Sequence, residues 1–238
     1  TITVRSLNTR SFVPIILSLA GKNNAFFTSE LVLTNKGTQD MTLNYTYTAA
    51  IGEGTSTGAD VIAAGTQKIV PDALNYLISL GMQIPSSGNR GGTLAVSHAG
   101  SADIGVMVRT TTAVSNGRAG LAYPGITINE ALNETAYIAG LRQTVTDRSN
   151  LAIQNMGTAS DGDITLRVTI FSGEPGNQSP NVLADTTLSP GDFFQHSGFL
   201  SNISNQYAKV ERIAGTAPFY AYGVINDNFN SDGSFVFP

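Results

Sequence analysis

Two stretches of this sequence, far apart in the chain, follow one pattern. Residues 29–37 read SELVLTNKG and residues 149–157 read SNLAIQNMG, so both fit S-x-L-x-(aliphatic)-x-N-x-G. In each stretch the leucine and the aliphatic residue are separated by one position, and this alternation predicts a β-strand with one buried face. A patterned segment that recurs in this way indicates an internal repeat.

Further matches occur in the same order in both halves. Residues 42–45 match residues 165–168, and residues 94–96 match residues 208–210. Both halves also close on an aromatic residue followed by proline. We therefore expect three parts: an N-terminal arm of residues 1–11, module 1 of residues 12–125 and module 2 of residues 126–238.

Each module shows the period of two that is typical of half-buried antiparallel strands. Leu43, Tyr45 and Tyr47 alternate with polar residues, and residues 165–170 repeat the pattern. Clusters of Gly, Asn, Asp and Ser separate the strands at spacings typical of sandwiches.

A short helix is expected once in each half. In module 1, Pro71 precedes leucines at helical spacing and Gly81 follows them. Residues 199–203 occupy the matching place in module 2. The predicted fold class is all-β, with two tandem Ig-like or Greek-key antiparallel β-sandwiches, each with one short crossover helix.

Composition excludes several classes of protein. Of the 238 residues, 41% are hydrophobic and 13% are charged, which is enough to build a core. The net charge of −4, without any basic block, disfavours nucleic acid as a partner. The chain has no cysteine, which excludes disulfides and cysteine-bearing metal sites, and we expect no cofactor. The longest apolar stretch, residues 12–20, is shorter than the roughly 20 residues of a membrane helix, so no membrane span is predicted.

The start of the chain has two readings. Arg5 and Arg10 before an apolar run imitate a signal peptide, but similar apolar content recurs at residues 136–141, so a first strand is favoured. The arm begins with an alternating tetrapeptide that predicts a short strand for assembly: Thr1, Ile2, Thr3 and Val4. This strand would pair with a sheet edge of its own chain or of a neighbour, and head-to-tail pairing between copies would produce a fibre.

The candidates for catalysis have structural interpretations that fit better. Gly54, Ser56 and Gly58 match the G-x-S-x-G elbow of serine hydrolases, but the surrounding polar residues favour a flexible hairpin tip. His98 and His196 have no Glu or His at metal-ligand spacing and are interpreted as structural. The chain is therefore not expected to be an enzyme.

Two binding motifs remain as weaker candidates. Asn228, Asn230 and Asp232 match the first, third and fifth places of a calcium loop, but the chain ends before the twelfth-place Glu, so we favour a hairpin without metal. A second set consists of aromatic residues that could stack on a sugar ring: Tyr207, Tyr220 and Tyr222. Because alternate residues of 219–222 must face the core, packing is favoured for this strand.

The sequence also resembles a group of largely uncharacterised secreted bacterial proteins built from tandem β-sandwich modules. The resemblance is carried by residues 27–37, 69–80, 88–96, 118–124, 148–157, 207–212 and 218–237. It implies secretion and a sandwich architecture, and it implies no catalytic activity.

We expect a non-enzymatic structural or adhesive protein, located outside the cell or on its surface. It would be a subunit of a fibre or filament assembled by addition of the N-terminal strand. Its partners would be copies of itself or other surface components. The alternative is a carbohydrate-binding module that holds a polysaccharide on the aromatic strand face of module 2.

Overall fold

The computed structural model describes residues 8–100, 103–176, 179–197 and 199–238. By its internal contacts the chain divides into two compact units. Unit 1 contains the chain up to Ala20, Phe26–Thr111 and Ala122–Glu130. Unit 2 contains Gly21–Ala25, Thr112–Leu121 and Ala131–Pro238, so that two short segments of module 1 belong to it.

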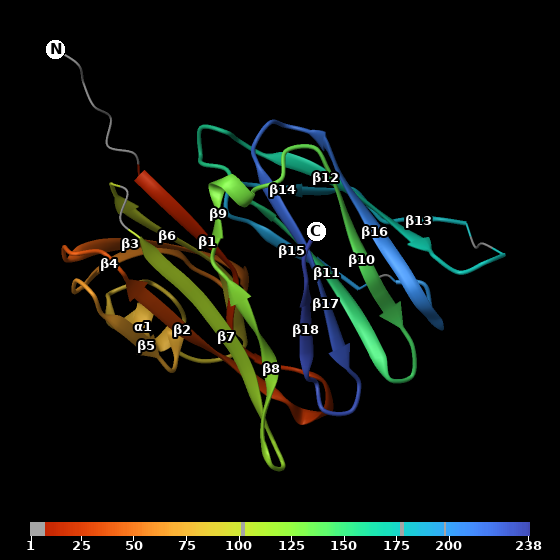
Figure 1. The fold of residues 1–238 in the computed structure, drawn as a ribbon, viewed down its shortest axis with the longest axis horizontal. Helices are drawn as coiled ribbons and strands as arrows, with labels where there is room; N and C mark the ends of the chain where they lie inside the picture. Colours follow the sequence, from red (N-terminus) through yellow and green to blue (C-terminus); the bar gives the residue numbers. More distant parts are fainter. Residues whose placement is uncertain (1–7, 101–102, 177–178, 198) are drawn as a thin grey trace. The chain divides into compact units, whose positions relative to one another are not determined.

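The first sheet has nine strands in the order β4-β3-β6-β1-β2-β7-β8, with β5 paired to β2 and β9 paired to β1 (Figure 1). The ladder between β1 and β2 is confined to residues 18–20 and 26–28 among the described residues, so the sheet folds over there into two layers. The elements are β1 Asn8–Ala20, the 3₁₀ turn η1 Lys22–Asn24, β2 Phe26–Asn35, β3 Met41–Ile51, β4 Thr55–Ile62, β5 Gln67–Val70, α1 Ala73–Ser79, β6 Arg90–Ala99, β7 Ile104–Val114, β8 Gly117–Pro124, β9 Ile126–Thr127 and η2 Ile128–Glu130.

The second sheet follows the same path with nine strands of its own. Its order is β13-β12-β16-β10-β11-β17-β18, with β14 paired to β12 and β15 paired to β11. It folds over where β10 and β11 meet, at Gln143 and Arg148. The elements are β10 Thr135–Gln143, β11 Asp147–Asn155, β12 Ile164–Ser172, β13 Asn181–Val182, β14 Thr186–Leu188, β15 Phe193–His196, β16 Ile203–Ala214, β17 Phe219–Asp227 and β18 Gly233–Val236.

The two sheets therefore confirm the predicted fold class of antiparallel β-sandwiches. Leu31 in β2 and Leu151 in β11 are both completely buried at equivalent positions. Leu31 pairs with Val70 of β5, and Leu151 pairs with His196 of β15. In β2 and in β11 every second side chain points into the core, as the shared pattern predicts.

The core of the second sandwich lies between its two folded layers. β10, β12 and β16 contribute one side, and β11 and β17 contribute the other. The buried members include Ile138, Leu151, Ile153, Leu166, Val168, Ile170, Val210, Phe219 and Ala221.

The asparagine of the repeated pattern is a buried hydrogen-bond staple. The Asn155 side chain accepts from the Gly157 amide at 2.8 Å and donates to the carbonyls of Leu188 at 2.9 Å and Gly162 at 3.1 Å. Asn35 makes the same set of bonds, with the Gly37 amide and with the carbonyls of residues 39 and 62. Each asparagine thus satisfies backbone groups of the loop that follows its strand and the last carbonyl of another strand, β4 for Asn35 and β14 for Asn155.

The serine of the pattern has the same kind of role. Ser29 Oγ accepts from the Leu17 amide at 2.9 Å, and Ser149 Oγ accepts from the Arg142 amide at 2.9 Å. Both serines are buried. They bond to the backbone at the corner where the sheet folds over, so the repeated pattern is accounted for by folding.

The predicted helix of module 1 is α1. Asp72 caps it, because its carboxylate accepts from the Asn75 amide at 3.0 Å. The side chains of Leu74 and Leu77, on the inner face of α1, are buried. Gly81 follows the end of the helix with a φ of +86°.

The helix predicted at residues 199–203 is wrong. β15 ends at His196 and β16 begins at Ile203, which leaves a connection too short for a capped helix. Instead, the buried Gln206 side chain accepts from the Leu200 backbone amide and donates to the carbonyls of Leu200 and Ile203. These bonds hold the connection as a turn. The crossover helix is thus present in module 1 and replaced by a turn in module 2.

Within the described residues, no helix is both long and apolar enough to cross a membrane.

Candidate functional site

The G-x-S-x-G segment fixes how one strand packs. Gly54 lies in the turn of the β3–β4 hairpin, as predicted, whereas Ser56 and Gly58 lie inside β4 and not at the hairpin tip. Ser56 Oγ accepts from the Gln83 amide at 2.9 Å. A Cβ atom at Gly54 would lie 2.4 Å from the Gln83 carbonyl oxygen, and one at Gly58 would lie 2.8 Å from Met82 Cγ. The two glycines therefore leave room for the chain segment that follows α1, and the serine hydrogen-bonds to it.

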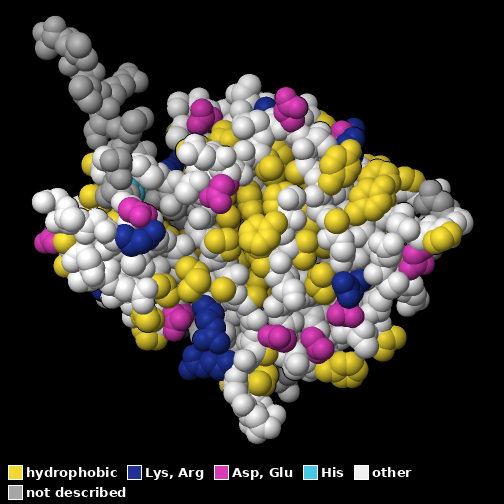
Figure 2. Space-filling model, in the orientation of Figure 1, with side chains coloured by type: hydrophobic (Ala, Val, Ile, Leu, Met, Phe, Trp, Pro, Cys, Tyr) yellow, Lys and Arg dark blue, Asp and Glu magenta, His cyan; other side chains and the backbone are white. Residues whose placement is uncertain are grey.

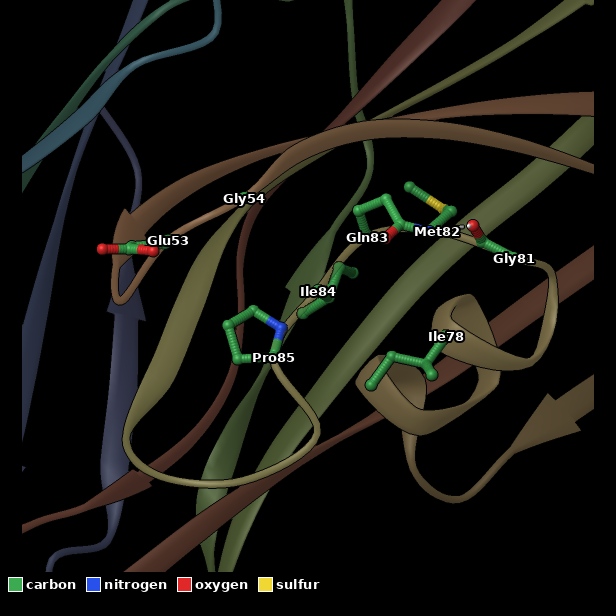
Figure 3. A pocket seen from close by; sticks show the side chains of 8 residues that line it. All are labelled: Glu53, Gly54, Ile78, Gly81, Met82, Gln83, Ile84 and Pro85. Atoms are coloured by element: carbon green, nitrogen blue, oxygen red, sulfur yellow. Dashed lines mark hydrogen bonds between the residues drawn. The ribbon is translucent and has the colours of Figure 1, made fainter.

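A shallow hollow of about 490 Å³ lies beside this segment (Figure 3). Figure 3 shows Ile78 on α1 and Glu53 at the turn between β3 and β4. The lining residues are Glu53, Gly54, Ile78, Gly81, Met82, Gln83, Ile84 and Pro85. Glu53 is the one ionisable residue of this lining.

Asp60, Lys68 and Tyr76 form a polar cluster that joins β4, β5 and α1. Lys68 Nζ lies 2.5 Å from Asp60 Oδ2 and 3.1 Å from the Tyr76 hydroxyl oxygen, and that hydroxyl donates to Asp60. Burial alone would raise the pKa of Asp60, but the hydrogen bonds from Lys68 and Tyr76 outweigh it and lower this pKa. Burial and the Asp60 carboxylate raise the pKa of Tyr76, which keeps the phenol protonated. The cluster anchors α1 to β4 and β5.

Both histidines are buried in strands. His98 Nδ1 lies 3.3 Å from the Ala99 carbonyl oxygen. His196 occupies the place that Val70 has in module 1, and its Nε2 lies 3.4 Å from Thr186 Oγ1. Burial lowers the pKa of His196 and favours the neutral ring. These surroundings support the structural interpretation of both residues.

The three oxygens of the calcium candidate are engaged separately. Asn228 Oδ1 accepts from Arg148 Nη1 at 3.1 Å, Asn230 Oδ1 accepts from the Asp232 amide at 2.7 Å, and Asp232 Oδ1 accepts from the Gly120 amide at 3.0 Å. A cation needs oxygens that converge, and one of these faces a guanidinium group. Across the described parts of the chain, no three His, Asp or Glu side chains come close enough together to hold a metal ion.

The assembly residues Thr1, Ile2, Thr3 and Val4 lie outside the described residues. The last part of the predicted arm belongs to β1, which begins at Asn8. Residues 8–11 pair with β6, and Ser11 also pairs with β9.

The three tyrosines proposed for sugar binding do not share one environment. Tyr220 and Tyr222 are 4% and 2% exposed on the face of β17 opposite Phe219 and Ala221. The ring of Tyr222 stacks on Phe235 at a centroid distance of 4.9 Å. These two rings are covered and offer no open face to a ligand.

Tyr207 differs because it lies half-exposed on the outer face of the second sandwich. It pairs directly with Phe171 across the β12–β16 ladder, and the two rings stack at 4.9 Å with an angle of 6° between their planes. Figure 2 shows hydrophobic side chains gathered over the part of unit 2 where Figure 1 places β12, β13 and β16. One face of the Tyr207 ring is therefore backed by Phe171, and the other is directed toward β10.

The strand beside Tyr207 carries a bulge made of small residues. The β10–β16 register breaks between Ile138, opposite Ala208, and Leu141, opposite Gln206. Ala139 and Gly140 fill this break, and Gly140 has a φ of +73°. A Cβ atom at Gly140 would meet nothing within 4 Å. The bulge is therefore exposed, and a side chain at Gly140 would not be crowded by residues other than its chain neighbours.

Two ion pairs lie on the same outer face. Lys209 Nζ is 2.7 Å from Glu211 Oε1, and Arg167 donates to both carboxylate oxygens of Asp185 at 2.9 and 2.8 Å. The Glu211 carboxylate raises the pKa of Lys209, and the hydrogen bond from Arg167 lowers the pKa of Asp185. Each pair brings one basic and one acidic side chain together.

Sequence reasoning identified Tyr207 but missed Phe171 and the bulge. The pairing of Phe171 with Tyr207 depends on strand register, which the sequence of either strand does not contain. One signal was available in the repeat: residues 94–96 match residues 208–210, so Thr93 stands where module 2 has Tyr207.

No protein-family model and no curated protein matches the chain.

Proposed function

We propose that this chain is a non-enzymatic structural or adhesive protein that acts outside the cell, as a subunit of a linear assembly. The proposal is supported by what the polar residues do. The repeated serine and asparagine bond to backbone, Ser56 seats a loop, and both histidines are buried. These side chains serve the fold, which leaves the surface and the sheet edges for function.

The observation that carries the proposal is the open edge of β4. This strand has eight residues, Thr55–Ile62, and in the described part of the chain it has a ladder partner, β3, on one side. Its Val61 side chain is 54% exposed. The Ile62 carbonyl at the end of β4 accepts from Asn35, and the rest of this edge is a template for pairing with a strand from another molecule.

The N-terminal residues have the pattern that such an edge accepts. Thr1, Ile2, Thr3 and Val4 alternate polar with β-branched apolar side chains. An added strand would gain backbone hydrogen bonds worth about 1 kcal/mol net each, and Ile2 and Val4 would add apolar burial. Addition to the β4 edge of another copy is a head-to-tail contact, and repeated addition gives a filament when the rotation between copies does not close a ring.

Light scattering coupled to size-exclusion chromatography tests this proposal. We expect the full chain to exceed its monomer mass of 24.9 kDa as concentration rises, and a variant without residues 1–7 to remain monomeric. This deletion stops before β1, whose pairing with β6 begins at Asn8.

The edge is tested separately by Val61→Lys, because an added charge on an edge strand blocks pairing. Val145→Lys is the matched control, since Val145 is 81% exposed in the turn after β10. Assembly that persists in the deletion variant, or that Val61→Lys and Val145→Lys reduce equally, would contradict strand addition at β4.

A further inference from the structure

We propose that the open face of Tyr207, above the β10 bulge, binds a pyranose ring of a neutral oligosaccharide chain. This inference deepens the proposed function, because it names the ligand class of the adhesive role and rests on that role being correct.

The Tyr207 ring forms one side of the proposed site, and the exposed bulge of β10 forms its base. Phe171 fixes the Tyr207 ring upright by stacking at 4.9 Å, a distance close to the spacing between neighbouring strands. The next strand on the other side is β10, which at this level contributes the bulge of Ala139 and Gly140. A Cβ at Gly140 would be in open space, so a flat ring can approach the exposed face of Tyr207.

The duplicated fold has different residues at these two positions, and the module 1 residue that matches Tyr207 is buried. In module 1 the equivalent pair in the β3–β6 ladder is Thr48 and Thr93. The same strands, in the same order, therefore fold with two threonines at this place. Module 2 replaces them with a stacked aromatic pair on an outer face, which is where binding residues are expected.

The charges around the ring favour a neutral, polyhydroxylated ligand. Two ion pairs lie on the same face of the sheet as the ring: Lys209 with Glu211, and Arg167 with Asp185. A net positive patch would suit an anionic polymer, and no such excess exists among these groups. Paired Lys and Glu side chains instead offer donors and acceptors side by side, and this is what vicinal hydroxyl groups require.

The arrangement fits a chain of sugars rather than a single ring. Lys209 and Glu211 follow Tyr207 on the same face of β16, at steps of about 7 Å for every two residues. Tyr137, which is 56% exposed, lies opposite Lys209 on β10. A pyranose with equatorial substituents presents a flat C–H face to Tyr207, while the next units along the chain reach the polar side chains.

Titration calorimetry with cellohexaose, a neutral β-linked hexasaccharide, tests the inference on the full chain. We expect Tyr207→Ala to weaken binding about tenfold, since an aromatic contact of this kind contributes up to about 1.5 kcal/mol. Ala139→Phe should weaken it as strongly by filling the space above the bulge, and it leaves Tyr207 intact. Phe194→Ala is the control, because Phe194 is 45% exposed in β15 and lies off this surface.

Equal binding by the wild type and by both surface variants, or no binding by the wild type, would overturn the site. Chromatography of the hexasaccharide after the titration separates this result from failure of the proposed function. Intact cellohexaose is expected, and shorter products would contradict a non-enzymatic protein whether or not Tyr207 contributes.

Discussion

Replacing Asn155 by alanine removes the staple at the end of β11. The side chain is completely buried and makes three hydrogen bonds, at 2.8, 2.9 and 3.1 Å, to the backbone of the loops after β11 and β14. A hydrogen bond of this kind contributes about 1 kcal/mol net, and buried groups left without a partner cost more. We expect Asn155→Ala to lower the free energy of unfolding by about 3 kcal/mol.

Urea unfolding monitored by far-ultraviolet circular dichroism measures this loss. Asn35→Ala should cost a similar amount, because Asn35 makes the corresponding bonds in module 1. Asn133→Ala is the control, since Asn133 is exposed and should change the free energy by less than about 0.5 kcal/mol. A loss below about 1 kcal/mol for Asn155→Ala would refute the staple as the reason for the repeated asparagine.

Three further predictions concern stability. Gly54→Ala should lower the free energy of unfolding in urea by about 3 kcal/mol, because the φ of Gly54 is +105° and an added Cβ would lie 2.4 Å from the Gln83 carbonyl oxygen. Gly88→Ala is the control and should cost only about 1 kcal/mol, since Gly88 has a φ of +83° but open space around its Cβ position. The melting temperature of the wild type should exceed that of Asp60→Asn at neutral pH. This difference should shrink as the pH falls below 3.8, the ordinary pKa of the carboxyl group, because the folded-state pKa of Asp60 lies below it. A difference that stays constant with pH would contradict a stabilising role for the Asp60 carboxylate in the cluster. The wild type should lose stability as the pH falls below 6.5, where the unfolded chain protonates His196 and the folded chain resists it, and His196→Val should lack this part of the loss in matched thermal melts.

Alternation in the sequence predicted the sandwich correctly because the buried faces are periodic. Leu31 and Leu151 lie in equivalent buried positions because both stretches point the same side chains inward. The first helix was also predictable, since Pro71, the buried leucines and Gly81 are all local signals. Such features depend on residues that are neighbours in the chain.

The errors came from contacts that form only in the folded structure. Residues 199–203 have helical spacing, but the Gln206 side chain and the short connection hold them as a turn. The glycines around Ser56 suggested a flexible tip, although they make room for residues 82 and 83. The Tyr207 surface was visible only in part, because the register that brings Phe171 beside it is a property of the folded sheet.

Negative-stain electron microscopy of the full chain at increasing concentration tests the central claim most directly. A structural protein that grows by strand addition is expected to form linear filaments, and these should disappear when residues 1–7 are removed. Dispersed particles the size of one 24.9 kDa chain at every concentration would contradict the proposal that the chain is an assembly subunit.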